Sequence, residues 1–146
     1  MNGIVVGVDG SEGARHALDW AANEAKLRDV PLTVVLAWQW PPGFYTGAGW
    51  AGVGPEVLDD LRTIAVEQLD GACSAVGPAL DGITVERRVV EGVPAQALLD
   101  AAEDADLLVV GTRGHGGFVG LLLGSVSQQC AHHSPCPIVI VPSKTT

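Results

Sequence analysis

Apolar residues along the chain follow two spacings, which together predict alternating strands and helices. Short, nearly continuous apolar runs are typical of strands covered on both faces, whereas apolar residues three or four positions apart are typical of helices packed on one side. The expected strands cover residues 1–8, 32–38, 83–90, 105–110 and 138–141. The expected helices cover residues 11–28, 56–76, 94–102 and 125–132. Because the connections are too long for hairpins, we expect right-handed crossovers and one α/β domain over residues 1–146, with a single five-stranded parallel sheet.

The third expected strand differs from the others in its polar content. Val85, Arg87 and Val89 alternate with Glu86 and Arg88. Strict alternation is typical of a strand with one face in the core and one in water. The pattern therefore predicts a partly exposed strand at an edge of the sheet.

Residues 39–55 interrupt the alternation with prolines, glycines and large aromatic side chains. A connection of this length inside a compact domain is usually functional or disordered, and aromatic residues argue against disorder. Two interpretations are open: an aromatic flap folded over the domain's own surface, or a lid over a ligand or partner contact. The aromatic residues in and beside this segment are Trp38, Trp40, Phe44, Tyr45 and Trp50.

Six glycines lie between the fourth expected strand and the helix that starts near Ser125. Glycine allows positive φ and lets a ligand approach the main chain closely. A glycine-rich turn before a helix directs several unpaired N–H groups at one point, where the helix dipole adds about half a positive charge. The segment therefore predicts a phosphate-binding turn, and the alternative is a surface loop that is merely rich in glycine.

The charge of the chain limits its ligands and partners. Seventeen acidic residues against eight basic ones give a net charge of −9, which disfavours DNA, RNA and anionic membranes. An anionic ligand must therefore be attracted locally, by main-chain N–H groups, a helix end, the Arg113 side chain and a divalent cation. Arg113 could instead lie against solvent.

Three features predict a cytoplasmic protein. No apolar run reaches the ~20 residues that a membrane helix needs. The chain begins directly with a strand pattern, so we expect no signal peptide. Cys73, Cys130 and Cys136 have no metal-ligand spacing and are expected to be small buried residues in a reducing compartment.

The spacing Gly111-x2-Gly114-x9-Gly124-Ser125 resembles the nucleotide-binding signature of the universal stress protein family. The opening Ile4–Ser11 resembles that family's first strand and turn, and the ending Cys136–Pro142 resembles its last strand. This resemblance implies a doubly wound sheet of the flavodoxin-like, or adenine nucleotide alpha hydrolase-like, type with strand order 3-2-1-4-5. It also implies an adenine nucleotide as ligand, namely ATP, which we expect to bind together with Mg2+.

The same resemblance assigns roles to individual residues. Asp9 and Gly111, with Val110 before it, are expected near the ribose or the base-proximal side of the nucleotide. The main chain of Ala37 is expected at the edge of the adenine. By this resemblance the expected phosphate ligands are Gly114, Gly124, Ser125, Val126 and Ser127. The position of Arg113 in the same turn adds its side chain to the expected phosphate ligands. Two alternatives stay open, since Asp9 could simply cap a turn and Ser125 could be an ordinary N-cap.

The last expected strand bears on assembly. Ile138–Val141 is apolar on both faces, and an exposed edge of this kind invites pairing with another chain. Universal stress proteins resemble this chain in pairing through their last strand, so a homodimer is expected. The alternative is that a neighbouring helix covers this edge.

Several functions compete with a regulatory or sensing nucleotide-binding module. A P-loop lysine is absent from the segment before Ser125, so any ATP hydrolysis is expected to be slow, although a slow ATPase or a nucleotidyl transferase is an alternative. A phosphoacceptor domain would need an acidic neighbour beside Asp9, which the sequence lacks. The remaining alternative is a structural partner protein without nucleotide.

Overall fold

The computed structural model describes residues 2–39, 55–112 and 123–142, with the side chains of residues 55–58 left aside. Its strands form one parallel sheet in the order β3-β2-β1-β4-β5, which confirms the predicted fold class and strand order. The strands are β1 (Ile4–Val8), β2 (Leu32–Trp38), β3 (Val85–Glu91), β4 (Leu107–Gly111) and β5 (Ile138–Val141). The helices are α1 (Glu12–Arg28), α3 (Pro55–Val76), the 3-10 helix η1 (Gly77–Leu80), α4 (Pro94–Ala101) and α5 (Ser125–His133).

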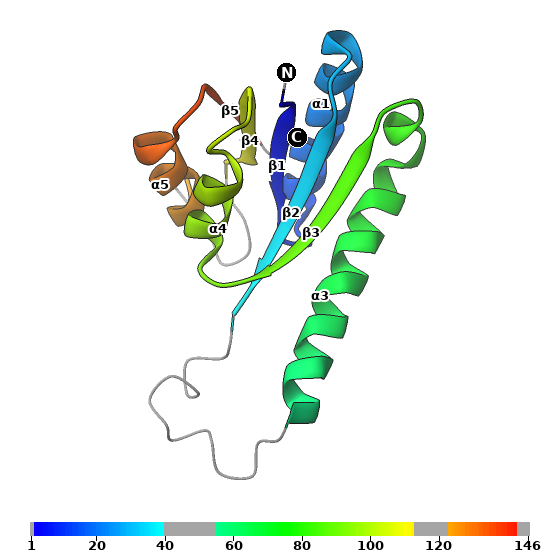
Figure 1. Ribbon diagram of the computed structural model, residues 1–146, viewed down its shortest axis with the longest axis vertical. Helices are drawn as coiled ribbons and strands as arrows, with labels where there is room; N and C mark the ends of the chain where they lie inside the picture. Colours follow the sequence, from blue (N-terminus) through cyan, green and yellow to red (C-terminus); the bar gives the residue numbers. More distant parts are fainter. Residues whose placement is uncertain (1, 40–54, 113–122, 143–146) are drawn as a thin grey trace.

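Helices cover both faces of the sheet, α1 and α3 on one face and α4 and α5 on the other (Figure 1). Each face has its own apolar core because successive residues of a strand point to opposite sides. Val6 and Val34 belong to the core beneath α1 and α3, whereas Val5 and Val35 belong to the core beneath α4. Burial on both faces explains why the central strands are apolar along their whole length.

Local sequence signals set most element boundaries, but several boundaries differ from the prediction; for example, β1 begins at Ile4 rather than residue 1 and β4 at Leu107 rather than residue 105. Ser11 caps α1 as expected, because its Oγ accepts a hydrogen bond of 3.2 Å from the N–H of Ala14. The helix α3 does not stop outright at Gly77, since the chain continues as η1 with Pro78 in its first turn. The third strand begins at Val85 rather than residue 83 and ends at Glu91.

The described helices include none that is both long enough and apolar enough to cross a membrane.

Candidate functional site

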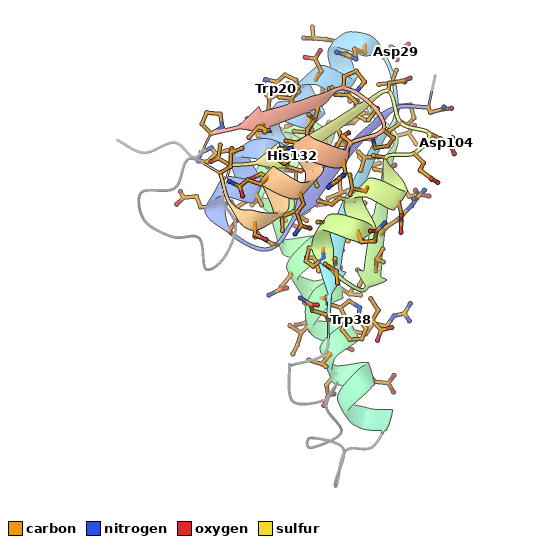
Figure 2. All side chains as sticks on the ribbon, turned by 90° about the vertical axis from the view of Figure 1, so that its left-hand side faces the viewer. Trp20, Asp29, Trp38, Asp104 and His132 are labelled. Carbon is orange, nitrogen blue, oxygen red and sulfur yellow. The ribbon has the colours of Figure 1, made fainter. Side chains whose placement is uncertain are left out.

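The carboxyl ends of β2, β1 and β4 bring two predicted site residues, Ala37 and Asp9, into one row with Thr112. Val8 pairs with Leu36 of β2, and Val6 pairs with Val109 of β4. Continuing this register places Asp9 between Ala37 and Thr112. The strand order reverses between β1 and β4, which is where parallel sheets of this type hold their ligands. In Figure 2, Trp38 marks this end of β2, beside α3.

Asp9 forms a tight turn between β1 and α1. Its Oδ1 accepts a hydrogen bond of 2.9 Å from the N–H of Ser11, and Gly10 adopts a φ of +85° that favours glycine. The N-cap of α1 is Ser11 and not Asp9, so the carboxylate fixes the turn before the helix. The half-buried carboxylate of Asp9 is thus held in the middle of the row by the main-chain N–H of Ser11.

Gly111 lies where β4 comes closest to the first turn of α1. A Cβ atom at Gly111 would lie 3.2 Å from the carbonyl oxygen of Gly13 and 3.3 Å from its carbonyl carbon. Both atoms belong to main chain, which cannot move aside as a side chain can. Glycine at position 111 therefore lets the end of β4 and the N-terminus of α1 lie side by side at the reversal of strand order.

The N-terminus of α5 contributes main-chain N–H groups to the same end of the sheet. Gly124 is the N-cap, and in the described part of the chain no side chain caps this helix. The N–H of Gly124 donates to the carbonyl oxygen of Thr112 at 2.6 Å, and the N–H of Gln128 makes the first helical bond, to Gly124. The N–H groups that begin the helix and suit an anion are therefore those of Ser125, Val126 and Ser127.

Ser127 has a different environment from the one its predicted role suggests. Its side chain is buried, at 2% exposure, and its hydroxyl lies 2.8 Å from the carbonyl oxygen of Thr112 and 3.0 Å from that of Gly124. The hydroxyl thus donates to the main chain on both sides of the segment between β4 and α5. The hydroxyl proton of Ser127 is therefore engaged by main-chain oxygens, which leaves its N–H for the predicted phosphate role.

Thr112 is a residue of this site that the sequence analysis missed. Its carbonyl oxygen accepts from Gly124 and Ser127, and its N–H donates to the carbonyl oxygen of Val141 at 3.1 Å. These bonds tie the end of β4 to α5 and to β5. All of them use main-chain atoms of Thr112, so the residue type gave no signal, and only its place after Gly111 could have indicated the role.

The remaining predicted residues fall into two groups. Val110 is buried in the core beneath α4 and α5, so only its main chain is available to a ligand, and Ala37 is half-buried. Arg113 and Gly114 lie outside the described residues, as does most of the aromatic segment 39–55. Within the described residues, no group of three or more His, Cys, Asp or Glu side chains is arranged to hold a metal ion.

The cysteines follow the prediction at two positions and depart from it at the third. Cys73 and Cys130 are buried, and burial raises the pKa of both thiols, that of Cys130 to about 11. Cys136 is only half-buried, with its Sγ 3.8 Å from the hydroxyl of Ser134. It precedes β5 in a short connection at the surface, which explains why the expected full burial is wrong there.

The sheet order and the turns at the ends of β1 and β4 define an α/β protein of the doubly wound, flavodoxin-like class. The sequence model described as "Universal stress protein family" matches residues 1–142, and the chain belongs to this family.

The chain is also similar to curated universal stress proteins of mycobacteria. The universal stress protein Rv2623 of Mycobacterium tuberculosis is 37% identical over 150 residues, which cover 95% of this chain and 47% of that protein. The chain thus spans about half the length of the curated relatives it matches.

Two solved structures of universal stress proteins contain adenine nucleotides. One, in complex with cAMP, has a TM-score of 0.67 and 31% identity, covering 98% of each chain. The other, from Archaeoglobus fulgidus in complex with dAMP, has a TM-score of 0.66 and 26% identity, covering 97% of this chain and 98% of that one.

Proposed function

We propose that this protein binds an adenine nucleotide, ATP in particular, at the carboxyl end of the sheet between β1 and β4. The observation that carries the proposal is the N-terminus of α5, where no side chain caps the first N–H groups in the described residues. These groups lie next to Thr112, which continues the row of Asp9 and Ala37. Helix N-termini of this kind favour phosphate through their N–H groups and their dipole.

Each part of the nucleotide has a matching part of the site. The N–H groups of Ser125, Val126 and Ser127 are assigned to the phosphates, together with Arg113 and Gly114. Asp9 and Gly111, preceded by Val110, are assigned to the ribose side, since a carboxylate accepts hydrogen bonds from ribose hydroxyls. The main chain of Ala37 is assigned to the adenine edge. Gly124 is assigned as the N-cap whose lack of a side chain lets phosphate approach.

The hydroxyl of Ser127 is assigned a positioning role. It bonds the carbonyl oxygens of Thr112 and Gly124, and so it holds both ends of the phosphate segment in place before a ligand arrives. A preorganised set of donors binds more tightly because less ordering remains to be done on binding.

Mg2+ is assigned to the nucleotide and not to a protein cage. The described residues contain no cluster of metal-ligating side chains, and Mg2+ is usually bound through one or two carboxylates and substrate phosphates. Asp9 is the carboxylate assigned to this end of the sheet. The cation would neutralise phosphate charge that the net charge of −9 otherwise repels.

Titration calorimetry with ATP and Mg2+ tests the proposal, in parallel with thermal unfolding. A ligand at one hundred times its Kd stabilises the native state by about 2.7 kcal/mol, so the melting temperature must rise. CTP at equal concentration controls for binding through phosphates alone. An absence of both heat and a melting shift at millimolar ATP would overturn the proposal.

We assign the bound nucleotide a regulatory role instead of rapid turnover. The carboxylate of Asp9 already accepts a hydrogen bond from Ser11, which fits a structural role better than that of a free general base. Phosphate release measured for the wild type and Asp9→Asn separates the two functions. Turnover that is lost in a variant still binding ATP would favour the slow ATPase.

A further inference from the structure

The open edge of β3 and the adjacent side of α3 form a groove that the nucleotide site does not use. The groove has a volume of about 430 Å3 and lies on the side of the sheet where α3 runs beside β3 (Figure 1). Its lining residues are Arg62, Val66, Leu69, Asp70, Arg87, Arg88, Val89 and Val90.

The helical wall of the groove is a single line of side chains. Arg62, Val66 and Asp70 are four residues apart on α3 and therefore lie on the same face of the helix. Val66 is 40% exposed, although an apolar residue gains by being covered. Along this wall, the exposed apolar side chain of Val66 therefore lies between the basic Arg62 and the acidic Asp70.

The other wall is the edge of β3, with which no described strand pairs. The carbonyl of Thr84 accepts from Leu32, and the N–H of Gly92 donates to Trp38, so the even-numbered residues of this segment face β2. The main chains of Val85, Arg87 and Val89 therefore face away from β2, where no described strand pairs with them. An extended segment lying in the groove can add to the sheet through these groups.

Charge sets the groove apart from the rest of the molecule. Three of the eight basic residues, Arg62, Arg87 and Arg88, line this one groove in a chain of net charge −9. Two of them form exposed ion pairs, Arg87 with Asp70 at 2.8 Å and Arg88 with Glu86 at 2.7 Å. Arg62 forms no ion pair with any residue that the structure describes.

These contacts can be exchanged for contacts with a partner. Arg87 and Arg88 are each about half exposed, at 48% and 47%, so water screens their ion pairs and little is lost when a different carboxylate takes over. Guanidinium groups favour carboxylates because they form two parallel hydrogen bonds with them. Two arginines on β3 would repel those of a second copy, which disfavours self-pairing at this edge.

We propose that the groove between α3 and β3 docks an extended acidic segment of a partner protein, which adds to β3 as a sixth strand. The main chain of the segment pairs with Val85, Arg87 and Val89. On the face toward α3, carboxylates of the segment contact Arg62 and Arg87 and an apolar side chain covers Val66. On the opposite face, a carboxylate contacts Arg88, because successive strand residues point to opposite sides. A flat anionic membrane does not enter a recess between a helix and a strand, and the overall negative charge repels nucleic acid.

Fluorescence anisotropy with a labelled octapeptide that repeats Val-Val-Glu-Glu tests the proposal on the full chain, because this repeat places both residue types on each face of a strand. We expect saturable binding with a Kd at or below about 1 mM, in the range of weak strand-adding motifs. The same peptide with lysine in place of glutamate should not bind. A version N-methylated on alternate residues, which cannot pair with a strand edge, should also fail.

Variants of the protein locate the site. Arg62→Glu and Arg88→Glu should each raise the Kd by about tenfold or more, since each replaces an attraction by a repulsion. Arg28→Glu, which makes the same change of charge at the end of α1, should leave the Kd unchanged. Arg62 is exposed on α3, so Arg62→Glu is expected to fold. If Arg88→Glu does not fold, the Kd of Arg62→Glu still tests whether the peptide binds in the groove.

Four results would overturn the proposal. The first is no binding of the glutamate peptide at millimolar concentration, and the second is equal binding of the lysine or N-methylated peptide. The third is an unchanged peptide Kd in both arginine variants. The fourth is displacement of the peptide by anionic phospholipid vesicles or duplex DNA that bind more tightly than the peptide. None of them depends on nucleotide, so the docking surface and the nucleotide site are tested separately.

Discussion

The buried hydroxyl of Ser127 bonds the carbonyl oxygens of Thr112 and Gly124, at the two ends of the segment that we propose to bind phosphate. Removing this hydroxyl should show whether it positions the segment or contacts phosphate directly. In Ser127→Ala the carbonyl oxygens of Thr112 and Gly124 lose this donor, which should lower the free energy of unfolding by about 1 kcal/mol. The affinity for ATP should fall by about tenfold, or about 1.4 kcal/mol, and that for adenosine much less. Calorimetry with ATP, AMP and adenosine measures this dependence on phosphate number.

Two further measurements distinguish the role of Ser127. Ser127→Thr keeps the hydroxyl and should restore ATP affinity. Amide hydrogen exchange of the ligand-free protein should become faster at Gly124 in Ser127→Ala, because its carbonyl and that of Thr112 are no longer held together. Unchanged exchange combined with lost affinity would instead indicate a direct bond from the hydroxyl to phosphate.

Gly111 and Gly71 form a matched pair for testing the close approach of β4 and α1. Gly111→Ala places a Cβ at 3.2 Å from the carbonyl oxygen of Gly13, which should destabilise the fold by about 1–3 kcal/mol. Gly71→Ala, in α3, meets no atom within 4 Å and should stabilise by about 1 kcal/mol. Urea unfolding gives both values, and equal effects of the same sign would contradict this account.

At the scale of the elements, the packing of α3 and α5 against the sheet buries Cys73 and Cys130 and so lowers the reactivity of their thiols. Burial raises the pKa of Cys130 to about 11 from its ordinary value of 9.0, and it also raises the pKa of Cys73. A thiol-specific reagent at pH 8 should therefore modify only the half-buried Cys136 in the native protein, and all three cysteines in denaturant. Rapid native modification of Cys130 would contradict the packing of α5.

The same pKa shift gives a pH dependence of stability. The folded state keeps the Cys130 proton to a higher pH than the unfolded state. The buried thiol therefore contributes fully to the free energy of unfolding below about pH 9, and this contribution is lost as the pH rises through about 11. Unfolding by urea between pH 8 and pH 11 should show a falling free energy. Cys130→Ala should show a smaller fall than the wild type, although its cavity lowers the starting value.

The elements were predictable from sequence to different degrees. Helices and strands followed from periodicity, and Ser11 marked the start of α1, because both are local properties. The strand order followed from the family resemblance, since patterning alone does not say which strands pair. The hydrogen bonds of Thr112 and the inward hydroxyl of Ser127 could not be predicted, because they depend on main-chain positions that only the packing of α5 against β4 decides.

At the scale of the whole molecule, the two edge strands differ in what they can pair with. The edge at β3 carries arginines, whereas Ile138–Val141 of β5 is entirely apolar and half-buried. Val139 and Val141 pack against the core beneath α1, and Ile138 and Ile140 against that beneath α4. No described strand covers the far side of β5, and Trp20 of α1 lies near it (Figure 2). We therefore propose that two copies pair through β5.

Main-chain direction supplies a sharp test of this pairing. The carbonyl oxygen of Pro137 accepts a hydrogen bond from Leu108 of β4, and that of Val141 from Thr112 just after β4. Ile138 and Ile140 therefore direct their main chains to the open side. Ile140→Pro removes an outward donor and leaves the pairing with β4 intact. Ile140→Thr makes the side chain polar but keeps that donor.

Light scattering should therefore find about 30 kDa for the wild type, twice the 15.0 kDa of one chain. Ile140→Pro should give the mass of one chain with unchanged circular dichroism, and Ile140→Thr should remain a dimer at high concentration. A wild type that stays at the single-chain mass at 100 μM or so would exclude a stable pair through β5. A monomeric Ile140→Thr would show that side-chain burial, and not strand pairing, holds the two copies together.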